Sequence, residues 1–289
     1  MNKYFCIICK MKQKYIFKSR GHTYFRCPQC DLVSTYPRPT PQVIKKHYQS
    51  KFKKGNYQML KLYAQEYNNV YDDFLNRLEK RLKTYKMNLK GKKLLDVGCF
   101  TGEFLKLAKK RGASVYGFEM QSEAVELANK TFKGRISQTD ISGSNVPKRK
   151  FDIITLLAVI EHVNNPVKMI ENALRMLKKG GVLMIETPDS GSFLANLMGK
   201  YWPPYRPIEH IHLFSQKSLE VLLKKNHQTE LFFEPHWKSL PVGYVYNQLS
   251  NFGPVFYRML KRFNFVISKI NDLTLPFYVG ETIVIVRKK

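Results

Sequence analysis

Short apolar runs and amphipathic stretches alternate along the second two-thirds of this chain. The apolar runs predict strands over residues 93–97, 114–118, 151–158 and 181–187. Between them, apolar residues recur at helical spacing over residues 102–111, 122–131 and 167–177. The run from Ile153 to Leu157 is apolar at nearly every position, as in a strand buried on both faces. The alternation predicts an α/β fold built on a doubly wound parallel sheet.

The C-terminal part continues with a predicted helix over residues 215–226 and strands over 230–234 and 281–287. A helical insertion at about 239–280 separates these two strands. It mixes apolar with basic residues: Phe252, Val255, Phe256, Met259, Leu260 and Phe263 beside Arg258, Lys261, Arg262 and Lys269. This amphipathic pattern fits a lid or a subunit contact, or an interfacial helix on an anionic membrane surface.

Two further units precede residue 91. Residues 40–90 are helical and basic in character, and we interpret them as a helical linker or cap. Five apolar residues there recur at helical spacing and predict one face packed on the next domain: Val70, Phe74, Leu75, Leu78 and Leu82. Residues 1–39 form a separate module that ends in a proline-rich connector, so residues 91–289 make up the main domain.

Four of the five cysteines in the chain form two pairs, Cys6 with Cys9 and Cys27 with Cys30, and 17 residues separate the pairs. Two such knuckles at this spacing supply four thiolates for one tetrahedral zinc ion. The sequence therefore predicts a small zinc-ribbon-like module and a reducing, cytoplasmic compartment, with disulfides as the alternative. Cys99 stands apart, and we interpret it as a packing residue.

Charge is the one unusual feature of the composition. The chain has 49 Lys and Arg against 22 Asp and Glu, a formal net charge of +27, and the excess is concentrated before residue 96. Such a field favours anionic partners, namely nucleic acid, an anionic membrane surface or acidic glycans. Solubility alone is the alternative explanation. No run is long and apolar enough to predict a membrane-spanning helix.

The segment around residue 100 carries the most specific chemistry. A buried strand ends at Asp96 and Val97, a turn with Gly98 and Gly102 follows, and a helix begins at once. The next strand closes on Glu119, at about the 20-residue spacing at which an acid accepts both ribose hydroxyls of a nucleoside. The glycine fingerprint of a pyrophosphate site is absent, which argues against a dinucleotide. An acid before the loop suits a ligand with positive charge.

Five segments together resemble a class I S-adenosylmethionine-dependent methyltransferase: residues 96–102, Glu119, and residues 151–154, 160–163 and 177–183. The resemblance covers roughly residues 90 to 235, and it is to the branch of ubiquinone-type O-methyltransferases and bacterial sugar or glycan methyltransferases. It implies a Rossmann-like sheet whose final strand is antiparallel. It also implies that S-adenosylmethionine contacts Asp96, Gly98, Phe100, Gly102, Glu119, Met120, Asp140 and Ala158. Phe100 stands where the family often has glycine.

Candidate catalytic residues follow two strands. Glu161 and His162 come after the strand 151–158, where the resemblance implies either a role in catalysis or a structural pair beside the cofactor. Quinone O-methyltransferases of this branch have a metal-associated acid three residues earlier, and here that position is Ala158. The second candidate is the segment 207–215, where His210 and His212 would share a face if the chain is extended. A histidine suits deprotonation of a hydroxyl, and we choose His210, with ordinary packing as the alternative.

Two classes of methyl acceptor remain open. A third possibility is that the chain has no catalytic activity. The resemblance favours O-methylation of a hydroxyl on a glycan or small metabolite by a cytoplasmic enzyme that can also lie at the membrane surface. RNA is the rival, supported by the charge and by the zinc modules of some RNA methyltransferases. Against RNA, base-amine methyltransferases place Asn/Asp-Pro-Pro-Tyr where this chain has residues 158–161. The third reading is a zinc-binding module that keeps only the fold.

Overall fold

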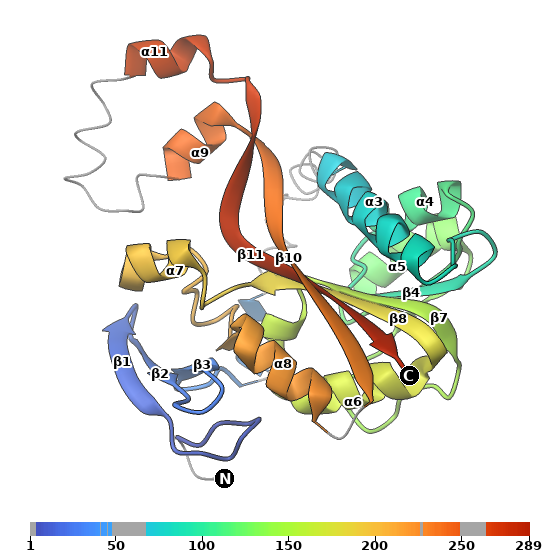
Figure 1. Ribbon diagram of the computed structural model, residues 1–289, viewed down its shortest axis with the longest axis horizontal. Coiled ribbons are helices and arrows are strands. Elements are labelled where there is room, and N and C mark those ends of the chain that lie inside the picture. The colour runs from blue at the N-terminus through green and yellow to red at the C-terminus, as the bar shows by residue number, and fades with distance from the viewer. Residues whose placement is uncertain (1–3, 41, 45, 48–67, 226–227, 249–263) are drawn as a thin grey trace.

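The computed structural model describes residues 4–40, 42–44, 46–47, 68–225, 228–248 and 264–289. Its centre is a seven-stranded sheet in the order β10-β11-β8-β7-β4-β5-β6 (Figure 1). The strands are β4 (Lys93–Val97), β5 (Ser114–Glu119), β6 (Ile136–Gln138), β7 (Phe151–Leu157), β8 (Leu177–Pro188), β10 (Thr229–Pro241) and β11 (Thr274–Lys288). β11 pairs antiparallel with both β8 and β10, whereas β4 to β8 run parallel. The predicted fold class is confirmed.

Helices cover both faces of this sheet (Figure 1). On one face, α3 (Asn68–Thr84), α4 (Glu103–Lys110) and α5 (Ser122–Phe132) enclose an apolar core with alternate strand residues. On the other face lie α6 (Pro166–Met176) and α8 (Gln216–Lys224). α3 buries all five residues of its apolar stripe, Val70, Phe74, Leu75, Leu78 and Leu82. Because the chain leaves β4 first toward β5 and later returns to β7, the strand order reverses beside β4, which is the position where open α/β sheets bind their ligands.

The N-terminal cysteine module contributes a second sheet. β1 (Lys14–Ser19), β2 (His22–Arg26) and β3 (Val33–Tyr36) form an antiparallel meander. A fourth strand, β9 (His212–Leu213), pairs with β3, so this sheet is completed by the main domain. A two-residue strand whose partner lies far away in the sequence leaves no periodic signal, and the sequence did not predict it.

The last two strands extend past the sheet as a two-stranded arm (Figure 1). The arm is formed by residues 237–241 and 274–278, and it carries α9 (Val242–Gln248) and α11 (Asn264–Lys269) at its tip. The sequence predicted the first of these strands over residues 230–234, whereas β10 continues through Pro235 to Pro241. β10 is the edge strand, where proline is tolerated. The predicted amphipathic residues between 252 and 263 lie outside the described residues.

The remaining described elements lie in the loops after β7 and β8. These are the 3₁₀ turns η1 (Ile160–His162) and η2 (Gly199–Tyr201) and the short helix α7 (Phe193–Met198). Within the described ranges, no helix has the length and apolar character needed to cross a membrane.

Candidate cofactor and acceptor site

The turn after β4 depends on two glycines. Gly98 and Gly102 have φ of 76° and 84°, in the left-handed region that favours glycine. A Cβ on Gly98 would lie 2.6 Å from Cγ2 of Val159, and one on Gly102 would run into the ring of Phe132. Gly102 is also the residue that caps α4, so the first amides of that helix face the carboxyl end of the sheet.

Glu119 ties this turn to the end of β5. Its carboxylate accepts hydrogen bonds from the backbone N–H of Phe100 at 2.9 Å, of Met120 at 2.7 Å and of Gln121 at 3.0 Å. Phe100 has φ of 47°, which explains why glycine suits this position, since a side chain there costs about 1–2 kcal/mol. The sequence placed Glu119, Phe100 and Met120 in one site, and the structure brings them together.

Asp96 is buried at the end of β4, one strand away. The Thr155 hydroxyl donates to its Oδ1 at 2.6 Å. Burial raises the pKa of Asp96 to about 7, and the nearby charge of Glu119 acts in the same direction. Glu119 and the partly ionised Asp96 place negative charge at the neighbouring ends of β5 and β4, which suits a cationic ligand group.

Asp140 completes the rim beyond β6. Its Oδ1 accepts from the backbone N–H and hydroxyl of Ser142 at 2.7 and 2.6 Å. It borders a cavity of about 320 Å³ together with Gln138, Thr139 and residues 143–145. The Gln138 amide donates to the Met120 carbonyl at 2.9 Å, which links this cavity to the loop after β5. The cavity therefore lies next to the loop that follows Glu119.

The three predicted catalytic residues lie together. One potential ligand or proton-accepting atom from each of Glu161, His162 and His210 falls within 4.8 Å of the others. The ring centroids of His162 and His210 lie 4.9 Å apart. The Thr187 hydroxyl donates a hydrogen bond to Glu161 Oε2 at 2.9 Å. Ala158, which has φ of 52°, directly follows the last residue of β7 and precedes this group. The cluster thus sits at the same edge of the sheet as the glycine turn.

Burial sets the ionisation of this cluster. It raises the pKa of Glu161 to about 7 and lowers the pKa of His210 to about 3, with the neighbouring His162 acting in the same direction on His210. His210 is therefore neutral at physiological pH. Its Nδ1 lies 2.6 Å from the Pro204 carbonyl, which can only accept, so Nδ1 carries the proton. Nε2 is then the basic nitrogen.

His210 and His212 do not share a face, and that expectation is corrected. The extended strand starts only at His212, while His210 lies in a turn closed by its N–H to the Arg206 carbonyl at 2.7 Å. His212 is buried against the cysteine module, with Nδ1 3.0 Å from the Ser34 hydroxyl. Burial lowers the pKa of His212 to about 3, with Arg38 contributing. His212 is therefore a packing residue.

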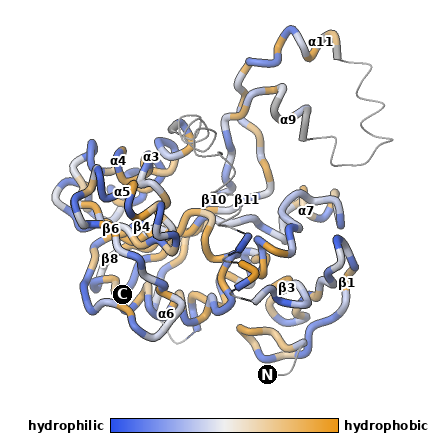
Figure 2. The backbone as a smooth tube through the Cα atoms, turned by 180° about the vertical axis from the view of Figure 1, so that it is seen from behind, coloured by the Kyte–Doolittle hydropathy of each residue, from blue (hydrophilic) through white to orange (hydrophobic). Residues whose placement is uncertain are grey.

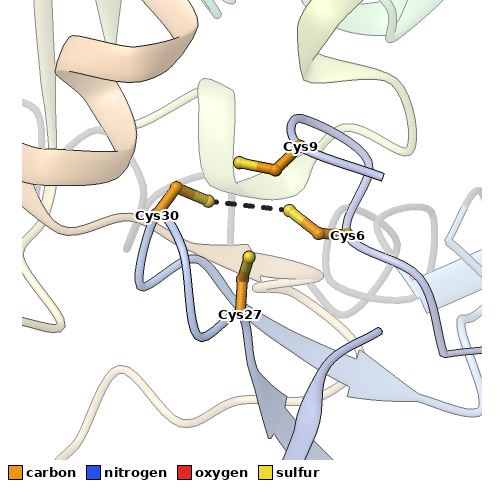
Figure 3. A group of neighbouring side chains, drawn as sticks. All are labelled: Cys6, Cys9, Cys27 and Cys30. Atoms are coloured by element: carbon orange, nitrogen blue, oxygen red, sulfur yellow. Dashed lines mark hydrogen bonds between the residues drawn. The ribbon is translucent and has the colours of Figure 1, made fainter. Parts of the chain in front are cut away.

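The four paired cysteines point toward one centre (Figure 3). Their sulfur atoms all lie within 4.8 Å of one another, and Sγ of Cys6 and Cys30 are 3.6 Å apart. That separation is too long for a disulfide, and it is close to the edge, about 3.8 Å, of a tetrahedron with metal–sulfur bonds of about 2.3 Å. A hydrogen bond from Cys30 lowers the pKa of the Cys6 thiol to about 5.

Both cysteine knuckles have the same backbone turn. Cys6 accepts from the Lys10 N–H at 2.9 Å, and Cys27 accepts from the Asp31 N–H at 3.0 Å. Lys10 and Asp31 have φ of 63° and 64°. Two equivalent turns that present paired thiols to one centre fit a four-coordinate ion better than they fit chance packing.

The sequence missed a second buried polar group, on the α3 face of the sheet. Nδ1 of His236 lies 3.2 Å from Glu281 and 3.4 Å from Glu186, and Nζ of Lys238 lies 2.5 Å from Glu281. Lys238 supplies positive charge, and hydrogen bonds to Glu186 and Glu281 raise the pKa of His236 against the effect of burial, so the group is a buried ionic cluster. Its only sequence signal is an acid inside an otherwise apolar strand, at Glu186 and again at Glu281.

The glycine turn, the acid after β5 and the cluster after β7 meet where strand order reverses, which is the arrangement of a class I methyltransferase. The family model described as a methyltransferase domain matches residues 63–227. The chain belongs to this methyltransferase domain family, in the enzyme class of S-adenosylmethionine-dependent methyltransferases.

The relatives agree with this assignment. A ubiquinone biosynthesis O-methyltransferase of Actinobacillus pleuropneumoniae is 29% identical over 155 residues, 50% of this chain and 61% of that protein. One of Coxiella burnetii is 35% identical over 106 residues, 35% of this chain and 45% of that protein. The chain thus spans about half the length of the curated relatives it matches. The plantazolicin methyltransferase BpumL, solved in complex with SAH, shares the fold at a TM-score of 0.53 and 17% identity, over 86% of this chain and 96% of that chain.

Proposed function

We propose that this protein transfers a methyl group from S-adenosylmethionine to a hydroxyl of a glycan or small metabolite. The observation that carries the proposal is the cluster of Glu161, His162 and His210 at the edge of the sheet that also holds the glycine turn. A sulfonium methyl is already activated, so the protein mainly has to align the acceptor and remove its proton.

The proposed cofactor residues fall into groups, each suited to a different part of S-adenosylmethionine. Glu119 is placed to accept the ribose hydroxyls, while the buried acid Asp96 and the turn from Gly98 to Gly102 face the cationic end. Met120, Asp140 and the cavity beside β6 offer a place for the base. S-adenosylmethionine supplies the electrophilic methyl group, and these residues orient it.

His210 is our general base. Its Nε2 is unprotonated at neutral pH. Because burial holds the pKa of His210 near 3, the proton transfer depends on the nearby Glu161, whose ionised carboxylate would stabilise the imidazolium that forms. Because the pKa of Glu161 is about 7, activity should rise with pH through this value as the carboxylate ionises. Ala158 in place of an acid supports catalysis without a metal at this cluster.

Transfer of labelled methyl groups into separate pools of small metabolites, glycans and RNA tests the reaction. We expect label in a hydroxyl-bearing small molecule or glycan. His210→Ala should lower turnover by about a hundredfold to ten-thousandfold with cofactor affinity unchanged, whereas His22→Ala on β2 should have no effect. Label in RNA bases would favour the RNA reading, and cofactor binding without transfer to any pool would favour the non-catalytic one.

We also propose that Cys6, Cys9, Cys27 and Cys30 hold one structural zinc ion. The buried apolar residues of the module, among them Ile8, Tyr24, Leu32 and Val33, pack into clusters shared with the main domain rather than into a core of the module's own, so the local fold should depend on the metal. Metal analysis of protein purified without chelator should find one zinc per chain, and Cys27→Ser should lose it, whereas Cys99→Ser should keep it. A zinc-free, folded protein would contradict this.

A further inference from the structure

The helix α7 presents an apolar face to solvent. Phe193 and Leu197 lie four residues apart, on one side of the helix, and are 77% and 68% exposed. Tyr201 in the following turn is 51% exposed. The opposite side of α7 is buried through Ala195 and Met198. The exposed side chains are therefore held in place by a well-packed helix.

The tip of the arm also exposes apolar side chains to solvent. Phe265 on α11 is 72% exposed, and it is followed by further exposed apolar residues, Ile270, Leu273 and Leu275. Figure 2 shows hydrophobic segments on both α7 and this part of the arm. Large exposed apolar groups in such number are unusual on a surface that only faces water.

The two apolar regions are joined through the root of the arm. Gly280, where β11 leaves the sheet, accepts a hydrogen bond from the N–H of Asp189 at 2.8 Å, just before α7. A Cβ on Gly280 would lie 3.0 Å from the hydroxyl of Ser192, the residue that caps α7. At the same root, the partly exposed Trp237 packs on Tyr278 with ring centroids 5.7 Å apart. α7 and the arm thus share one anchoring point.

Basic side chains accompany both apolar regions. Residues 191–208 contain Lys200 and Arg206 and no acid, and residues 264–275 of the arm tip contain Lys269 and one acid, Asp272. Lys200 lies over the Tyr201 ring at 5.2 Å and Lys269 over the Phe265 ring at 4.4 Å, so cations and apolar groups alternate on the surface. Aromatic and aliphatic groups mixed with lysine are typical of surfaces that enter the lipid interface.

We propose that α7 and the arm tip form a docking surface for an anionic lipid membrane. A second copy of this chain would bring the same positive charge against itself, which opposes a symmetric contact. RNA would meet the lysines and the aromatic faces of Phe193, Tyr201 and Phe265, but it gives no reason for the exposed aliphatic side chains of Leu197, Ile270, Leu273 and Leu275. A lipid surface satisfies both features, because headgroups meet the lysines while Phe193, Leu197 and Phe265 enter the acyl boundary.

Vesicle flotation of the full chain tests this docking independently of the reaction. The protein should float with vesicles of phosphatidylcholine and phosphatidylglycerol, but weakly with phosphatidylcholine alone, and salt should weaken the binding. The double variant Phe193→Ser, Leu197→Ser should reduce binding by about tenfold or more. Lys200→Gln and Lys269→Gln should each reduce it by about fivefold. Tyr15→Ser, at an exposed position on β1, is the matched control and should bind like the wild type.

Three results would overturn the proposal. The first is the absence of any preference for anionic vesicles. The second is unchanged binding in the lysine variants, which remain informative even if the serine variant folds poorly. The third is a dimer in sedimentation analysis that dissociates in the Phe193→Ser, Leu197→Ser variant, since a second copy would then be the occupant.

Discussion

Replacing Gly102 with alanine tests the turn on which the cofactor site depends. At φ of 84° a side chain costs about 1–2 kcal/mol. The new Cβ would also meet the buried ring of Phe132, and overpacking of this kind costs about 1–3 kcal/mol. Together the two effects should lower the free energy of unfolding by about 2–5 kcal/mol.

Gly134→Ala separates these two effects. Gly134 has φ of 79°, nearly that of Gly102, but a Cβ there has no atom within 4 Å. It should therefore show only the backbone cost of about 1–2 kcal/mol. The entropy that alanine removes from the unfolded chain is common to both variants and cancels in the comparison.

Urea unfolding followed by circular dichroism measures both losses. The double variant Gly102→Ala, Phe132→Leu should recover part of the stability, because the smaller side chain makes room for the methyl group. Equal losses in Gly102→Ala and Gly134→Ala, or no recovery with Phe132→Leu, would show that contact with Phe132 does not constrain the turn.

Three further expectations concern charge. Glu119→Ala should weaken binding of S-adenosylmethionine by about 1–3 kcal/mol in calorimetry, and Glu126→Ala on the exposed side of α5 should not. Lys238→Ala removes one of the cations that face the two buried glutamates and should cost about 3–5 kcal/mol in urea unfolding, whereas Lys178→Ala, at a pair that is 44% exposed at the lysine, should cost at most about 1 kcal/mol. The pKa of Glu161 is raised from 4.5 to about 7, so the folded state holds a proton that the unfolded state has lost. Stability should therefore fall as pH rises between these values, and less steeply in Glu161→Gln; equal slopes would contradict the assignment.

The main sheet was predictable because its signal is local. Runs such as Ile153 to Leu157 record burial on both faces, and Gly98, Gly102 and Glu119 mark a turn whose chemistry needs those residue types. The arm was not predictable. Its strands pair with each other beyond the sheet, and a proline such as Pro235 usually marks the end of a strand.

The buried ionic cluster around Glu186 could not be predicted from the sequence, for a different reason. One acid in an apolar strand does not reveal which residues will neutralise it, and here they come from β10 and β11. The partner of His212 was likewise hidden, because Ser34 lies 178 residues away. Long-range polar contacts follow from the tertiary fold, and a single sequence carries no period that encodes them.

The cysteine module and the acceptor side of the site are joined through one residue. Ile211 accepts a hydrogen bond from the N–H of Thr35 in β3 at 3.1 Å and donates its own N–H to the carbonyl of Glu161 at 2.8 Å. The segment that carries His210 is therefore held between the ribbon on one side and the proposed catalytic cluster on the other. A module attached only by a linker would leave this segment free to move, whereas a fourth strand shared between the two units fixes where His210 can lie. The metal that we propose to stabilise the ribbon would thereby also stabilise the position of the proposed base.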